Sequence, residues 1–103
     1  MKTIKNYDEF LEIIKNEMIV IIAKTKMCVV CKPLSEKLKI FMEDYTTIPA
    51  YEVYLEDVEL FQGQHLVFTV PTILVFSEGK EILRESRFID FSKIERLFNL
   101  YLN

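Results

Sequence analysis

The chain contains two cysteines, Cys28 and Cys31, separated by only two residues. Apolar periodicity after them predicts a helix, and side chains three positions apart on a helix lie close enough to form a disulfide. Unpaired N–H groups and the positive dipole end at a helix N-terminus stabilise a thiolate. We therefore expect Cys28, at the start of this helix, to be a nucleophile. The nearby Lys24 and Lys26 are expected to favour its thiolate.

Thiol–disulfide exchange gives each cysteine a role. The Cys28 thiolate attacks a disulfide of another protein and forms a mixed disulfide, and Cys31 then attacks this bond and releases the reduced partner. The reaction uses no cofactor and no metal. The spacing thus predicts a catalytic dithiol.

Other roles are open for the pair. Inert core cysteines would have to lie in the solvent-facing start of a helix, an unusual place for buried thiols. A closed zinc site needs four ligands. The chain offers two cysteines and one distant histidine, His65, so zinc would require a second chain. We expect His65 to be an exposed loop side chain outside the catalytic set.

The elements that position the cysteines follow from hydrophobic periodicity. An amphipathic helix is predicted over residues 7–17. The run Met18–Ala23 is apolar and rich in β-branched residues, which is typical of a central strand covered on both faces. After a short polar loop, a long helix is predicted from Cys28 onward. Its apolar positions are Leu34, Leu38, Phe41 and Met42.

The second half of the chain continues the alternation. We predict a strand over residues 50–55, a short helix over 57–61, a loop over 62–65 and a hairpin formed by 72–76 and 81–85. A closing helix begins behind Asp90 or Ser92 as its cap. This order predicts an α/β fold whose central mixed sheet is parallel at first, antiparallel at one edge and flanked by helices on both faces.

Four segments carry a resemblance to a known family: Met18–Ala23, Cys28-Val29-Val30-Cys31-Lys32, Val70-Pro71-Thr72 and Glu78-Gly79. With these motifs, the sequence resembles the thioredoxin family over essentially its full length. The resemblance implies the thioredoxin fold and a protein-disulfide oxidoreductase with catalytic Cys28 and Cys31. It also implies a cis-proline at Pro71, which an X-Pro bond adopts at modest cost. The backbone of Val70 is then expected to pair with substrate peptide. Met27, Val29 and Val30 complete the expected substrate-binding residues.

The sequence departs from the family at several positions near the cysteines. The family's tryptophan before the first cysteine is Met27, and its Gly-Pro between the cysteines is Val29-Val30. A glycine beside the cis-proline corresponds to Arg87, where a cation is expected to favour acidic substrates or to block large ones.

The family's proton-carrying buried carboxylate is also absent. It maps onto Ile22, and its lysine partner maps onto Val53. We therefore expect both buried charges to be replaced by apolar residues, which avoids stranding one charge alone. Proton transfer to Cys31 would then need water or another group.

Composition narrows the remaining possibilities. With 103 residues, half of them hydrophobic, we expect a single domain over 1–103. Thirteen basic and sixteen acidic residues leave a net charge of −3, which argues against nucleic acid as a partner. The longest apolar run, Met18–Ala23, is far short of the roughly 20 residues that span a bilayer, so no membrane association is expected. The N-terminus lacks the pattern of a secretory signal. We expect a cytoplasmic monomer.

The leading hypothesis is a cytoplasmic reductant of protein disulfides, supplied with electrons by an upstream reductase. Three alternatives stay open: a catalytically weak binding or adaptor module, a redox sensor, and a carrier of metal at the dithiol. The unusual residues Ile22, Val29, Val30 and Arg87 motivate the adaptor alternative.

Overall fold

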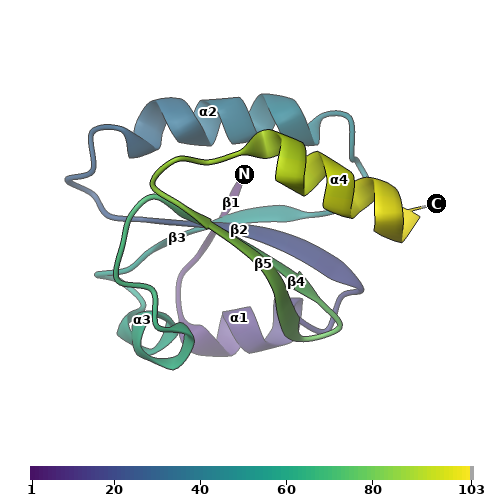
Figure 1. Cartoon of the computed structure of the whole chain (residues 1–103). Coiled ribbons are helices and arrows are strands. Elements are labelled where there is room, and N and C mark those ends of the chain that lie inside the picture. The colour runs from purple at the N-terminus through teal and green to yellow at the C-terminus, as the bar shows by residue number, and fades with distance from the viewer. Residues whose placement is uncertain (103) are drawn as a thin grey trace.

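Five strands form one sheet in the computed structural model, which describes residues 1–102 (Figure 1). The strands are β1 (Lys2–Ile4), β2 (Met18–Lys24), β3 (Ala50–Tyr54), β4 (Thr72–Ser77) and β5 (Lys80–Ser86), in the spatial order β1-β3-β2-β4-β5. β3 pairs in parallel with both β1 and β2, whereas β4 is antiparallel to β2 and to β5. The predicted mixed sheet is confirmed.

Four helices cover the two faces of this sheet. They are α1 (Tyr7–Ile13), α2 (Cys31–Met42), α3 (Glu59–His65) and α4 (Phe91–Leu102). Figure 1 shows α2 and α4 on one face and α1 and α3 on the other. The chain therefore has the expected three-layer α/β architecture.

The central strand β2 contributes to two separate cores because alternate side chains of a strand point to opposite faces. Ile19, Ile21 and Ala23 pack in the core beneath α1 and α3. Val20 and Ile22 pack in the core beneath α2 and α4. Burial on both faces explains why this strand is apolar almost throughout.

Several helix bounds differ from the sequence-based predictions. α1 ends at Ile13 rather than at residue 17, and α2 begins at Cys31 rather than at Cys28. The predicted loop over 62–65 is wrong, because these residues belong to α3. Gly63 interrupts the helical pattern there, but Phe61 anchors the helix with a fully buried side chain.

Capping groups and turns follow the local sequence. Asp90 is the cap of α4, since its carboxylate accepts hydrogen bonds from the Ser92 backbone N–H and hydroxyl. The β4–β5 hairpin turns at Glu78 and Gly79, with φ values of 51° and 83°. Two positive φ angles in a two-residue turn are the geometry that matches the twist of a hairpin.

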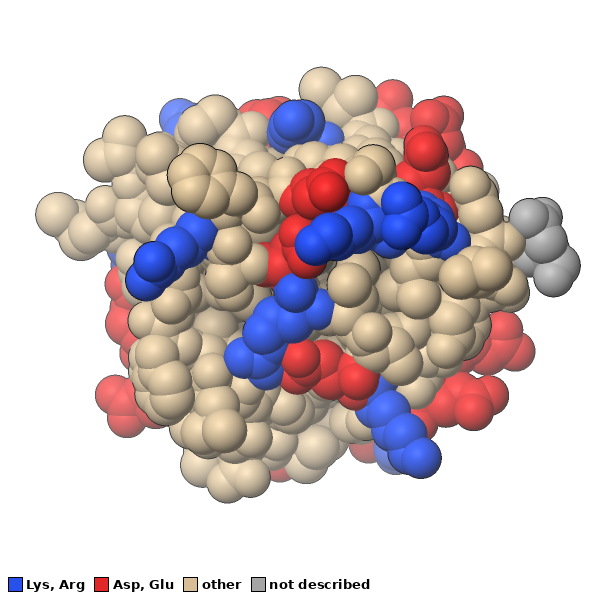
Figure 2. Space-filling model, viewed as in Figure 1, with Lys and Arg blue, Asp and Glu red and all other residues tan. Residues whose placement is uncertain are grey.

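The distribution of surface charge and the length of the helices can be compared with the expectations from composition. Acidic and basic side chains are interspersed among neutral residues on the face shown in Figure 2. Within residues 1–102, no helix has the length and apolar character needed to cross a membrane.

Candidate redox site

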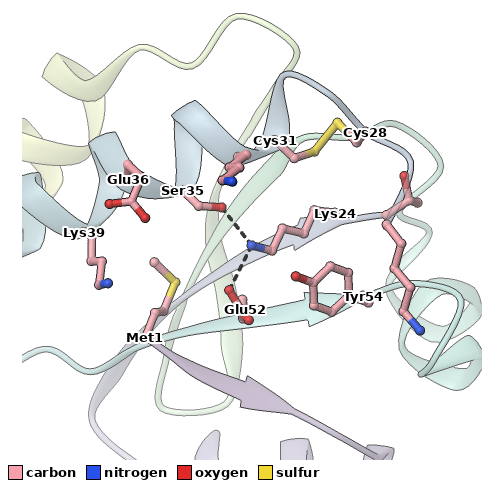
Figure 3. Close-up of a pocket in the computed structure, with 12 residues that line it drawn as sticks. Met1, Lys24, Cys28, Cys31, Ser35, Glu36, Lys39, Glu52 and Tyr54 are labelled. Atoms are coloured by element: carbon pink, nitrogen blue, oxygen red, sulfur yellow. Dashed lines mark hydrogen bonds and ion pairs between the residues drawn. A yellow bond between two sulfur atoms is a disulfide. The ribbon is translucent and has the colours of Figure 1, made fainter.

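Cys28 and Cys31 form a disulfide at the junction between β2 and α2 (Figure 3). Their Cα atoms are 5.4 Å apart, within the usual range for this bond. Because α2 begins at Cys31, Cys28 lies in the turn before the helix and not in the helix itself. Backbone hydrogen bonds hold the turn: the Cys28 N–H donates to the Thr25 carbonyl at 3.2 Å, and the Cys31 N–H donates to the Cys28 carbonyl at 3.3 Å.

The two cysteines differ in accessibility. Cys28 is partly exposed, whereas Cys31 is only 2% exposed. Exchange requires one sulfur to meet the sulfur of another molecule, which an enclosed thiol cannot do. The geometry therefore distinguishes an outer sulfur, on Cys28, from an inner sulfur, on Cys31.

The proline segment lies at the same end of the sheet as the cysteines. Thr72, the first residue of β4, pairs with Ala23 near the end of β2, and the chain from β2 leads directly to Cys28. The Val70-Pro71 peptide bond is cis, as the resemblance implies. The Pro71 carbonyl accepts a hydrogen bond of 3.2 Å from the Arg87 N–H.

Exposed apolar side chains flank the cysteines and the cis-proline along the chain. Met27 and Val29 are 88% and 86% exposed, and Val30 is also exposed. Two further exposed aromatic residues were not predicted from the sequence: Phe68 shortly precedes the cis-proline in the chain, and Phe88 directly follows Arg87. Solvent-exposed apolar side chains of this kind are typical of a protein-interaction site.

A pocket of about 320 Å³ opens on the β3 side of the disulfide and is lined by both cysteines (Figure 3). Lys24, at the end of β2, points into it although its side chain is only 8% exposed. Its ammonium donates to the Ser35 hydroxyl at 2.9 Å and forms an ion pair with Glu52 at 2.8 Å. The pocket therefore has a buried, charged wall.

This ion pair contradicts the expectation of an uncharged site. Ile22 is apolar and fully buried, as predicted, but Val53 packs in the opposite core, beneath α1 and α3. The residue paired with Ile22 across the sheet is Glu52, and Lys24 follows Ile22 on the same face of β2. The pairing of Ile22 with Glu52 depends on the strand register, which single positions in the sequence do not specify.

Hydrogen bonds and neighbouring positive charges keep Glu52 ionised. Burial opposes its ionisation, but hydrogen bonds from Lys24 and Thr3, together with the positive charges of Lys24 and the N-terminus, outweigh this effect and lower the pKa of Glu52 below its ordinary value. The carboxylate is thus ionised at neutral pH and accepts from both partners. Lys26, by contrast, lies on the surface, where its ammonium contacts Asp57 at 3.1 Å.

His65 is not the exposed loop residue that we expected. It ends α3, is half-buried, and lies against the rings of Phe10 and Phe61 with centroid distances of 4.8 Å in both cases. Its Nε2 atom is 3.2 Å from the Tyr7 hydroxyl. Burial lowers the pKa of His65. Its partners belong to the core beneath α1 and α3, on the sheet face opposite α2.

Among the residues that the structure describes, no cluster of three potential metal ligands occurs.

Arg87 is exposed and adopts a positive φ of 64°, and its backbone N–H forms the hydrogen bond with Pro71. A position of this kind favours glycine, which is the residue that the resemblance places there.

No protein-family model matches the sequence. The chain is 36% identical over 78 residues to the thioredoxin-like protein YdfQ of Bacillus subtilis (strain 168), covering 72% of this chain and 70% of that protein. The chain belongs to the thioredoxin family. Its disulfide is the active-site disulfide of a thioredoxin-like redox protein, with a Cys-Val-Val-Cys motif.

Solved structures confirm the thioredoxin fold. Plasmodium falciparum thioredoxin superimposes with a TM-score of 0.86 at 20% identity, covering 98% of this chain and 99% of that one. A chain from a study of thiol resolution in yeast mitochondrial 1-Cys peroxiredoxin via glutathione/thioredoxin systems superimposes with a TM-score of 0.84. It is 18% identical and covers 96% of this chain and 93% of that one. At these identities, the similarity shows the fold alone.

Proposed function

We propose that this member of the thioredoxin family is a thiol–disulfide oxidoreductase that reduces disulfides of other proteins. The observation that carries the proposal is the pairing of an accessible sulfur, on Cys28, with an enclosed sulfur, on Cys31, in one disulfide. This arrangement supports separate roles for the two cysteines: Cys28 attacks the substrate, and Cys31 resolves the intermediate.

The proposed reaction starts from the reduced dithiol. The Cys28 thiolate attacks one sulfur of the substrate disulfide, and the second substrate sulfur leaves as a thiolate that takes a proton from solvent. Cys31 then loses its proton and attacks the Cys28 sulfur of the mixed disulfide. The Cys28–Cys31 bond forms, the bond to substrate breaks, and two electrons have passed to the substrate. An upstream reductase must return the Cys28–Cys31 disulfide to the dithiol.

Substrate binding is assigned to the residues around the disulfide. Met27, Val29 and Val30 offer exposed apolar contacts, and the backbone of Val70 before Pro71 is proposed to pair with an extended substrate peptide. The yeast chain studied with a peroxiredoxin supports a protein as the substrate class, because it has the same fold.

The setting of the reaction completes the proposal. We propose that the chain acts as one domain and as a monomer in the reducing cytoplasm, where a dithiol is maintained in its active form. Neither a cofactor nor a membrane takes part in the proposed reaction.

The test is catalysed reduction of a disulfide-linked fluorogenic peptide, with dithiothreitol regenerating the dithiol. The wild-type protein should accelerate the reaction, and Cys28→Ser should reduce the rate to the background. When the reduced Cys31→Ser protein is freed of dithiothreitol and mixed with the peptide, it should instead accumulate a mixed disulfide, detectable by mass spectrometry. Equal rates for wild type and Cys28→Ser would refute the proposed function.

Arg87 and the exposed Val29-Val30 pair favour a second candidate, a binding module that captures partners without turnover. Wild-type protein would then accumulate the mixed disulfide that the reductase forms only as Cys31→Ser. The redox potential of the couple separates the possible directions of exchange: a value of about −270 mV indicates a reductant, and one of about −120 mV indicates an oxidant.

A further inference from the structure

A chain of polar contacts crosses the molecule beneath the disulfide. The Thr3 hydroxyl on β1 donates to one oxygen of Glu52 on β3, whose other oxygen lies 2.8 Å from the Lys24 ammonium on β2. Lys24 in turn donates to Ser35 on α2 at 2.9 Å. These contacts join three parallel strands to the helix that begins with Cys31.

The two charged groups in this series of contacts, on Lys24 and Glu52, are placed differently relative to Cys31. Ser35 follows Cys31 by four residues, so both side chains lie on one face of α2, and both line the pocket with Lys24. Glu52 is held away from α2 by Thr3, at the β1 side. In Figure 3 the Lys24 ammonium lies between Ser35 and Glu52, on the cysteine side of the carboxylate. The positive charge is therefore the one that faces Cys31.

The environment of Cys31 makes this charge important. With 2% exposure, Cys31 is almost completely enclosed. Burial disfavours the charged form of a thiol, so an isolated Cys31 would resist deprotonation. Yet resolution of a mixed disulfide requires its thiolate. Cys31 lines the pocket beside Lys24, and water entering this pocket is the proton acceptor that the proposal below invokes.

We propose that Lys24 acts on the reaction through Cys31. Its buried ammonium stabilises the Cys31 thiolate, which resolves the mixed disulfide. The proposal rests on the proposed function, because it concerns the second step of that exchange. Glu52 and Ser35 orient the ammonium, and Glu52 also reduces its net effect on Cys31. Lys24 thus acts in this chain where other members of the family are expected to use a buried carboxylate at the position of Ile22.

The proposed step is balanced. Pocket water accepts the proton of Cys31, and Lys24 stays protonated as a fixed cation. The Cys31 sulfur then forms its bond with Cys28 while the bond between Cys28 and the substrate breaks. The departing substrate thiolate carries the electron pair and is protonated by solvent.

The other charged and titratable groups at the pocket are placed to have smaller effects. Lys26 is exposed and paired with Asp57. The Tyr54 ring lies 5.1 Å from the Lys24 ammonium and contacts it by its face. The rim carries Lys32, Glu36 and Lys39, which are exposed, and Met1 also lines the pocket, where its N-terminal ammonium attracts the Glu52 carboxylate. Exposed charges are screened by water and salt, so we expect the buried Lys24–Glu52 pair to act more strongly on Cys31 than the charges of the rim do.

The test measures thiolate formation by Cys31 directly, in a Cys28→Ser background where it is the one remaining thiol. Ultraviolet absorbance of the thiolate is followed against pH. Lys24→Met should move the midpoint to higher pH and lower the thiolate fraction at fixed pH about tenfold, as expected for loss of a nearby opposite charge. Glu52→Gln should move the midpoint to lower pH. Lys26→Met, a lysine lining the same pocket from the surface, is the matched control and should leave the midpoint unchanged.

Opposite shifts in the two variants are the decisive result, since general loosening of the fold would move both midpoints in one direction. Equal midpoints for Lys24→Met and the background protein would overturn the proposal, as would a shift of the same sign in Glu52→Gln. If Lys24→Met alone does not fold, the Cys31 midpoint is compared between Glu52→Gln and the double variant Lys24→Met/Glu52→Gln. The proposal requires the higher midpoint in the double variant. None of these readouts needs turnover, so they are independent of the activity test with Cys28→Ser.

Discussion

Arg87 is the residue that most directly changes the chemistry of the proposed docking surface. Its N–H donates to the Pro71 carbonyl, and its side chain is exposed. A cation at this point attracts carboxylates of a bound peptide. Because the site is exposed, the attraction is worth at most about 1 kcal/mol.

We predict that Arg87→Gln lowers kcat/KM up to about fivefold for disulfide peptides with acidic flanks, since that ratio corresponds to about 1 kcal/mol. Peptides with neutral flanks should be reduced at unchanged rates. Steady-state kinetics on the two peptides measure the difference, and Arg96→Gln, an exposed arginine of α4, serves as the control. An equal loss on both peptides would show that Arg87 does not select by charge.

Some residues of the site could be predicted from the sequence and others could not. The cysteine spacing and the Val70-Pro71 bond are local features, so they can be identified directly in the sequence. Lys24 and Glu52 lie 28 positions apart and contact each other only because β2 and β3 pair in one register. Residue types cannot specify that register, and a single shift would place the carboxylate on the opposite face.

Among the elements, α3 has an unusual C-terminal end. It closes at Leu66, which is exposed and adopts the left-handed conformation with a φ of 53°. Arg84 on β5 donates to the carbonyls of His65 and Leu66, so the end of the helix is tied to the sheet. A leucine in this conformation is strained, whereas glycine is not.

We predict that Leu66→Gly raises the free energy of unfolding by about 0.5–1 kcal/mol, the relief of strain less the entropy of glycine in the unfolded chain. Leu60→Gly is the matched control because Leu60 is also an exposed leucine but lies within α3, and it should lower that free energy by about 1 kcal/mol. Urea unfolding measures both. A loss of stability in Leu66→Gly would mean that the leucine side chain contributes packing that outweighs its backbone strain.

Long elements with strong periodicity could be predicted, and short ones could not. The apolar run of β2 and the amphipathic pattern of α2 contain enough residues to show their type. The three residues of β1 show no pattern of their own and become a strand by pairing with β3. Gly63 indicated a loop, but burial of Phe61 outweighs the weak helix propensity of one glycine.

For the whole molecule, His65 links elements that are distant in the chain. Its ring contacts α1 through Tyr7 and Phe10, α3 through Phe61, and β4 through Phe76 at a centroid distance of 5.6 Å. Charging this ring would place a cation among aromatic side chains of the core. Burial accordingly lowers the pKa of His65 in the folded protein.

The stability of the molecule should therefore decrease in mildly acidic solution. The unfolded chain takes up the proton of His65 near its ordinary pKa of about 6.5, whereas the folded chain takes it up only at lower pH. The contribution of neutral His65 is fully present above about pH 6.5 and is lost as the pH falls through the folded pKa. We predict that the free energy of unfolding by urea decreases over this interval in the wild type and stays nearly level in His65→Gln. His65 is the sole histidine, and carboxylates titrate at lower pH, so the interval reports on this side chain. A parallel decrease in His65→Gln would assign the acid sensitivity to other groups and separate His65 from the stability of the core.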